Sequence, residues 1–263
     1  MCYDDQARPP QPPGNPGDAS GQDITLTSAD GTPFSAYAAI PSLPTNSRII
    51  IYPDVRGLHQ FYKDLALRFA EIGISAVAID YFGRTAGQTS RDESFEYMPH
   101  VQQIKLENVI ADLKAARDYE AENIGNHQQT FVVGFCMGGA LTIATGTEPD
   151  LGLNGLIAFY AGMSRNFGGK GTALDLATQV KYPVLGLFGG QDQGIPVEQV
   201  NLLRHRLVEA NVRQEIVVYP EATHSFFDRR QEEFAAASAD SWKRILNFIA
   251  TGDPTQTDAV EIK

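Results

Sequence analysis

The chain has 263 residues, of which 43% are hydrophobic, and a formal net charge of −11 that comes from 32 acidic and 21 basic side chains. This length and apolar content suit one α/β domain with one substantial core. An acidic average field repels nucleic acid and anionic membrane surfaces, so neither is expected as a partner.

Residues 1–22 are rich in Pro, Gly, Asp and Gln and have no apolar core such as a signal peptide carries. We expect a disordered tail there, because so little apolar area does not offset the entropy of ordering the backbone. Cys2 lies in this tail and Cys136 is the only other cysteine, so no disulfide framework is expected. Free thiols are typical of a reducing compartment, which favours the cytoplasm.

The single domain is expected over residues 23–250, and a loose polar tail over residues 251–263. Apolar residues alternate on both sides of Asp30-Gly31, which is typical of an antiparallel hairpin. Later apolar runs lack alternation and are separated by helical periods, which predicts right-handed βαβ units around a mostly parallel, doubly wound sheet. These runs lie at residues 49–52, 75–79, 130–135, 153–160, 183–188 and 214–219.

Two connections between these elements are long enough to consider for function. Residues 81–100 are rich in Gly, Thr and Ser, and a loop of this length more often serves a function than a simple connection. Residues 167–171 are glycine-rich but lack the ending of a phosphate loop and the spacing of a dinucleotide motif. A nucleotide site is therefore not expected there. No segment reaches the apolar length of a membrane span.

The run at 130–135 leads into Gly134-Phe135-Cys136-Met137-Gly138, which has the spacing of the G-x-S-x-G nucleophile elbow with a thiol at its centre. In that motif a strained strand-to-helix turn lifts the nucleophile above the sheet, and small flanking residues let the helix approach. At a helix N-terminus, Cys136 would be favoured as a thiolate. The alternative is a buried structural thiol between a tightly packed strand and helix.

A thiol nucleophile needs a base and a group that orients the base. His224 follows the last predicted strand and Asp192 follows the strand before it, at the sheet edge where ligands bind in such folds. Taken singly, His224 could be a satisfied core imidazole and Asp192 a helix N-cap. The order nucleophile, acid, histidine is that of α/β-hydrolases, which favours catalysis.

Three motifs together resemble the dienelactone hydrolase family: Gly-Phe-Cys-Met-Gly-Gly, Gly-Gln-Asp-Gln-Gly-Ile-Pro and Ala-Thr-His-Ser-Phe. The resemblance covers residues 23–249. It implies an α/β-hydrolase fold and a Cys136-Asp192-His224 triad that opens lactone or ester bonds, without a metal or organic cofactor.

The resemblance also implies further site residues. The backbone N–H groups of Val55 and Met137 would stabilise the oxyanion. Arg84, in Asp80-Tyr81-Phe82-Gly83-Arg84, matches the family's arginine that binds the substrate carboxylate; otherwise it is an ordinary solvated arginine. Tyr160 resembles a pocket residue or caps the core.

Two positions depart from the family pattern. Asp54 stands where the family has a glutamate beside the nucleophile, and it is followed by Arg56. Asp228 stands where a second carboxylate-binding arginine is found, with Arg229 and Arg230 after it. Asp54 could accept the thiol proton or restrain Cys136, and an anionic lactone would be held less firmly without the second arginine.

Together with the resemblance, these residues imply a hydrolase similar to carboxymethylenebutenolidases, which would open a small ester or lactone through a thioester intermediate. We expect a small-molecule substrate and a monomer or small homo-oligomer. The alternatives are a general carboxylesterase or thioesterase on the same scaffold, and a catalytically silent module that binds a small molecule.

Overall fold

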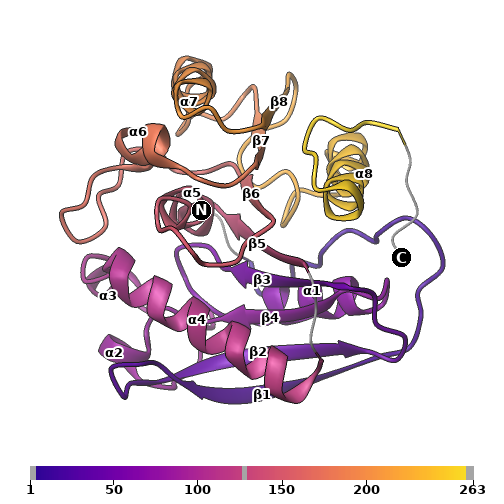
Figure 1. The fold of residues 1–263 in the computed structure, drawn as a ribbon, viewed down its shortest axis with the longest axis vertical. Helices are drawn as coiled ribbons and strands as arrows, with labels where there is room; N and C mark the ends of the chain where they lie inside the picture. Colours follow the sequence, from indigo (N-terminus) through magenta and orange to yellow (C-terminus); the bar gives the residue numbers. More distant parts are fainter. Residues whose placement is uncertain (1–3, 126–128, 259–263) are drawn as a thin grey trace.

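The computed structural model describes residues 4–125 and 129–258. One eight-stranded sheet has the order β1-β2-β4-β3-β5-β6-β7-β8, with helices on both faces (Figure 1). The strands are β1 (Ala19–Thr27), β2 (Pro33–Pro41), β3 (Ser47–Tyr52), β4 (Ser75–Ile79), β5 (Gln129–Phe135), β6 (Gly155–Phe159), β7 (Val184–Gly189) and β8 (Gln214–Tyr219).

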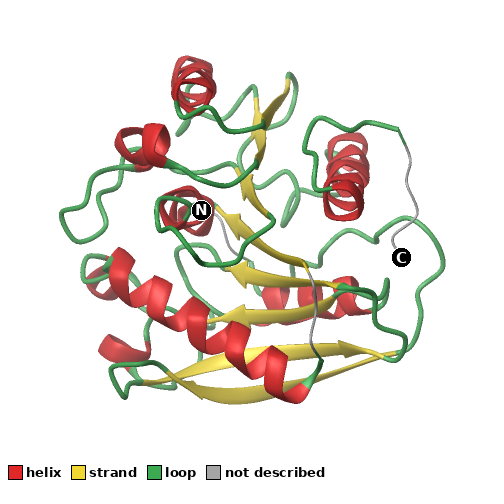
Figure 2. Cartoon of the chain, viewed as in Figure 1, coloured by secondary structure: helices red, strands yellow, loops and turns green. Residues whose placement is uncertain are grey.

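Most helices connect successive parallel strands. They are α1 (Gln60–Ala70), α2 (Gly83–Ala86), α3 (Met98–Val101), α4 (Leu106–Asn123), α5 (Met137–Thr145), α6 (Ala173–Leu176), α7 (Val197–Glu209) and α8 (Ala235–Thr251), with a 3₁₀ turn η1 (Ala177–Gln179). In the view of Figure 2, α4 crosses the near face of the sheet and α1 lies behind it. The Phe69 ring of α1 lies 4.9 Å from the Trp242 ring of α8, so these two helices share a face.

The sheet confirms the predicted fold class. β1 and β2 pair antiparallel, β2 pairs antiparallel with β4, and every other neighbouring pair is parallel. Every residue of β3, β4, β6 and β7 is buried, because helices cover these strands on both faces. The edge strand β1 is mostly exposed, which fits its polar sequence.

The N-terminal segment differs from the expectation of a disordered tail over residues 1–22. β1 already begins at Ala19, and the Trp242 indole Nε1 donates to the Pro10 carbonyl at 3.0 Å. Ala7 is buried against the core, and the Gly17 N–H donates to the Glu71 carbonyl at 2.7 Å. The folded domain supplies the apolar area that the segment lacks, and proline lowers the entropy lost on ordering. Cys2 lies outside the described residues.

The C-terminal boundary lies close to the expected one. α8 ends at Thr251, and Gly252 follows in the left-handed conformation with a φ of 69°. The Asn247 side chain donates to the Gln256 carbonyl at 3.4 Å, so part of the expected loose tail folds back on α8. Residues 259–263 of that tail lie outside the described residues.

The long connection over residues 81–100 is attached to the domain by a buried ion pair. Arg91 Nη2 lies 2.9 Å from Asp80 Oδ2, and both side chains are almost completely buried. The Arg91 guanidinium also stacks over the Phe95 ring, 4.4 Å from its centroid. Among the residues described, none of the helices has both the length and the hydropathy needed to cross a bilayer.

Candidate active site

Cys136 occupies the sharp turn between β5 and α5 that the elbow motif predicts. Its φ of 55° and ψ of −112° lie outside the favoured regions for a residue with a side chain, which costs about 1–3 kcal/mol. A Cβ atom at Gly134 would lie 2.1 Å from the Gly138 carbonyl oxygen. One at Gly138 would lie 2.2 Å from the Tyr52 carbonyl oxygen. The flanking glycines are therefore required by the close approach of strand, turn and helix.

The backbone around Cys136 holds the strained turn in place. The Cys136 N–H donates to the Phe159 carbonyl at 3.1 Å, and its own carbonyl accepts from the Ala140 and Gly162 N–H groups, each at 3.2 Å. The thiol thus sits at the N-terminus of α5, half-buried. The positive end of the helix dipole favours negative charge at this position.

His224 and Asp192 form a close pair after neighbouring parallel strands. His224 Nδ1 lies 2.6 Å from Asp192 Oδ2, and the Asp192 side chain is only 2% exposed. The other carboxylate oxygen accepts from the Gly194 N–H at 2.9 Å. The Asp192 carboxylate, oriented by this hydrogen bond, in turn fixes the orientation of the imidazole, whose side chain is 24% exposed.

Tyr160 connects this pair to the elbow. Its ring lies 4.8 Å from the His224 ring and 6.2 Å from the ring of Phe135, the residue before Cys136. Tyr160 is fully buried, and its hydroxyl donates to Asp228 Oδ2 at 2.9 Å. Tyr160 is therefore a buried residue whose ring packs against the histidine.

A cleft of about 560 Å³ opens at Cys136. Val55, from the loop after β3, and Met137, the first residue of α5, line it together with the cysteine. The first N–H groups of a helix have no partner within the helix, which suits Met137 to donate outward. The structure thus places both residues expected at the oxyanion beside Cys136.

The cleft also contains residues that the sequence patterns did not single out. Gln102, Arg165 and Asn166 line it, and Arg165 is the one charged side chain among its described lining residues. Arg165 lies a few residues beyond the C-terminal end of β6, at the sheet edge where Cys136, Asp192 and His224 also follow their strands. A survey of the residues after every predicted strand would have included it.

Asp54 is engaged by its own loop. Its carboxylate accepts from the Arg56 N–H at 2.9 Å and lies 3.4 Å from His59 Nε2, and the residue is 1% exposed. The Asp54 N–H donates to the Tyr62 hydroxyl at 2.9 Å. Burial raises the pKa of Tyr62 well above its usual value, and the nearby Asp54 and Cys136 add to the rise. Asp54 is thus close to the site without lining the cleft.

Arg84 is not brought into the cleft. Its two terminal nitrogens bind Asp112 of α4 at 2.8 and 2.9 Å, and its Nε binds Asp30 in the β1–β2 turn at 2.8 Å. The hydrogen bond from Arg84 lowers the pKa of Asp30 to about 2. Burial raises the pKa of Asp112, and Arg84 offsets part of that rise. The guanidinium therefore joins α2, α4 and the hairpin, which is a structural arrangement.

The region after His224 offers no arginine to the cleft among its described lining residues. Asp228 accepts from Tyr160, and Arg230 forms an ion pair with Glu233 at 2.5 Å. Within residues 4–125 and 129–258, no cluster of three or more His, Cys, Asp or Glu side chains has the geometry to hold a metal ion.

The sequence profile of the Dienelactone hydrolase family matches residues 34–252. An Escherichia coli K12 protein named "Putative carboxymethylenebutenolidase" is 31% identical over 244 residues, which cover 89% of this chain and 88% of that protein. The Pseudomonas putida protein named carboxymethylenebutenolidase is 27% identical, over 86% of this chain and 95% of its own length. A crystal structure described as a "Putative Dienelactone Hydrolase", from Klebsiella pneumoniae, superposes with a TM-score of 0.77 at 27% identity, over 89% of this chain and all of that one.

Proposed function

This chain belongs to the dienelactone hydrolase family, and from that premise we propose that it opens a small ester or lactone with Cys136 as nucleophile, His224 as general base and Asp192 as orienting acid. Two observations carry the proposal: the 2.6 Å pair of His224 and Asp192, and the strained backbone of Cys136 at the start of α5. The substrate class is that of carboxymethylenebutenolidases, the name that the E. coli and P. putida relatives bear.

In the first half-reaction, His224 Nε2 takes the proton of the Cys136 thiol as the sulfur attacks the carbonyl carbon. The carbonyl oxygen becomes an oxyanion, which the N–H groups of Val55 and Met137 stabilise. The C–O bond then breaks as the oxyanion collapses to a thioester. The leaving oxygen takes the proton back from His224, and in a lactone it remains tethered to the acyl chain.

Water completes the reaction. His224 removes a proton from the water, whose oxygen attacks the thioester carbon, and the C–S bond breaks to release a carboxylic acid and regenerate Cys136. Asp192 keeps the proton of the imidazole on Nδ1 and stabilises the imidazolium that forms twice in each cycle. Asp192→Asn should therefore lower kcat by about 10⁴-fold through the wrong tautomer, with little change in fold.

A general carboxylesterase on the same scaffold is the second candidate, and a specific observation favours it. Arg84, the residue expected to bind a substrate carboxylate, instead forms ion pairs with Asp112 and Asp30. Asp228 stands where the second carboxylate-binding arginine is expected, and it accepts a hydrogen bond from Tyr160. A substrate without a carboxylate requires neither arginine.

Turnover of a panel of neutral aryl esters and of cis- and trans-dienelactones tests the proposal. Cys136→Ala should lower kcat by about 10⁴-fold or more on every substrate that the enzyme hydrolyses. Hydrolysis of esters without dienelactones would assign a general esterase. If neither class is hydrolysed although Cys136 is labelled stoichiometrically by a thiol reagent, the hydrolase proposal is wrong and a binding module remains.

A further inference from the structure

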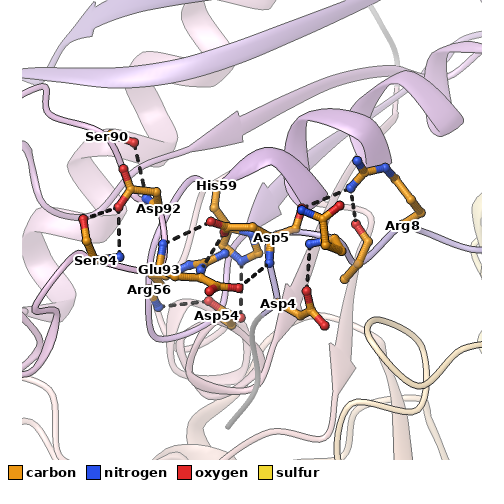
Figure 3. A network of polar contacts seen from close by, with 12 residues as sticks. Asp4, Asp5, Arg8, Asp54, Arg56, His59, Ser90, Asp92, Glu93 and Ser94 are labelled. Carbon is orange, nitrogen blue, oxygen red and sulfur yellow. Dashed lines mark hydrogen bonds and ion pairs between the residues drawn. The ribbon is translucent and has the colours of Figure 1, made fainter.

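A short N-terminal segment spans the side of the domain next to the oxyanion loop. We call residues 4–10 the strap and residues 53–58 the oxyanion loop. The strap begins at the loop after β4, where the Asp5 N–H donates to Glu93 Oε1 at 3.0 Å. It ends against α8, where Trp242 donates to the Pro10 carbonyl. Figure 3 shows Asp5 near the middle of this network, with Arg56 and Glu93 on one side of it and Arg8 on the other.

The centre of the contact is an ion pair with a buried arginine. The Arg56 side chain is 0% exposed, and its Nη1 lies 2.8 Å from Asp5 Oδ1. A guanidinium removed from water in this way is unfavourable unless anionic groups compensate its charge. Asp5 Oδ2 also accepts from the Glu93 N–H at 3.2 Å, so one carboxylate joins two loops that are far apart in sequence.

Arg56 directly follows Val55, which lines the cleft with Cys136. Other hydrogen bonds to the oxyanion loop come from residues that follow β4. The Tyr81 hydroxyl donates to the Pro53 carbonyl at 2.9 Å. The Leu58 N–H donates to Asp80 Oδ1 at 3.1 Å. Asp5 adds an attachment from a segment that precedes the first strand.

We propose that Asp5 is a positioning residue for ester cleavage, and that its ion pair with Arg56 holds the Val55 N–H where the oxyanion forms. The inference rests on the proposed function, in which Val55 is an oxyanion donor. An interaction used only in the transition state changes kcat and kcat/KM together and leaves KM unchanged. Loss of Asp5 should therefore slow turnover without weakening substrate binding.

The test compares full-length Asp5→Asn with Asp4→Asn as a matched control. The control removes a neighbouring charge whose carboxylate accepts from the Gln6 N–H at 2.7 Å within the strap. Two rates are measured for each variant: hydrolysis of a neutral aryl acetate, and alkylation of Cys136 by iodoacetamide. Alkylation displaces iodide at a saturated carbon and forms no oxyanion, so it reports the nucleophile alone.

Asp5→Asn should lower kcat by about tenfold or more; complete removal of an oxyanion donor costs about 10²–10³-fold. KM and the alkylation rate should stay within about twofold of wild type. Asp4→Asn should match wild type, and Asp5→Glu should recover part of kcat.

An unchanged kcat in Asp5→Asn would overturn the proposal. So would a parallel fall in kcat and alkylation, since that pattern indicates a general loss of structure at the site. The proposed function has its own readout: if the wild type hydrolyses neither this ester nor the dienelactones, or if Cys136→Ala hydrolyses them as fast, that function fails, and the positioning role fails with it.

Discussion

Replacement of Arg84 by alanine separates a structural role from a substrate-binding one. In the folded chain the Asp112 side chain is 1% exposed and receives two hydrogen bonds from the Arg84 guanidinium, which is 14% exposed. Arg84→Ala would leave the Asp112 carboxylate buried without this cation. We expect a loss of stability and no effect specific to anionic substrates.

The expected magnitude follows from the burial of the pair. Removal of one partner of a buried ion pair costs about 3–5 kcal/mol, because the remaining charge is uncompensated. Arg84 retains some contact with solvent, so the lower end of that range, about 3 kcal/mol at neutral pH, is expected for Arg84→Ala.

The loss should depend on pH in a defined direction. Burial already raises the pKa of Asp112, and removal of Arg84 raises it further. A carboxyl group whose pKa is higher in the folded than in the unfolded state stabilises the folded state less as pH rises through that interval. Arg84→Ala should therefore be closer to wild type at pH about 5 than at pH about 8.

Urea unfolding of wild type, Arg84→Ala, Asp112→Asn and the double variant measures these effects. The double variant should be more stable than Arg84→Ala, because it no longer buries an unpaired charge. Arg213→Ala, which removes an exposed pair with Asp253, is the control and should cost less than about 1 kcal/mol. Unchanged stability together with a KM increase confined to carboxylate-bearing esters would refute this reasoning and restore Arg84 as a substrate ligand.

Two further predictions follow from buried groups. Gly138→Ala places a Cβ 2.2 Å from the backbone oxygens of both Tyr52 and Pro53. The substitution should lower the free energy of unfolding by about 1–3 kcal/mol, measured by urea titration, and should reduce kcat, measured by ester hydrolysis. Burial raises the pKa of Glu120 well above its usual value, although Arg48 lies 3.7 Å away. The contribution of Glu120 to stability should thus fall as pH rises above about 4.5, the usual pKa of a glutamate, and Glu120→Gln should change the slope of stability against pH by up to about 1.4 kcal/mol per pH unit. Equal slopes for the two proteins in urea titrations across this range would contradict the second prediction.

The strands and the elbow could be predicted from local patterns. An uninterrupted apolar run such as residues 49–52 predicts a strand that is buried on both faces. This prediction does not depend on the position of the strand within the parallel sheet. Gly134 is needed because of a backbone contact within the motif, with the Gly138 carbonyl, whereas Gly138 is needed because the backbone at the end of β3, Tyr52 and Pro53, approaches it. Because parallel strands end at one edge of a sheet, the order of Cys136, Asp192 and His224 predicts that they lie at that edge, where His224 and Asp192 form a close pair.

The partners of long charged side chains could not be predicted in this way. Arg84 pairs with Asp112, 28 residues away, and Trp242 binds the backbone of Pro10, 232 residues away. A motif gives the identity of an arginine, but its partner depends on which carboxylate the packing of distant helices places within reach. The same holds for Arg165, which lines the cleft because the chain turns there after β6. The sequence thus specified the candidate site residues through local patterns and strand order, whereas tertiary packing set the charges around them, since electrostatic partners are chosen by proximity in space.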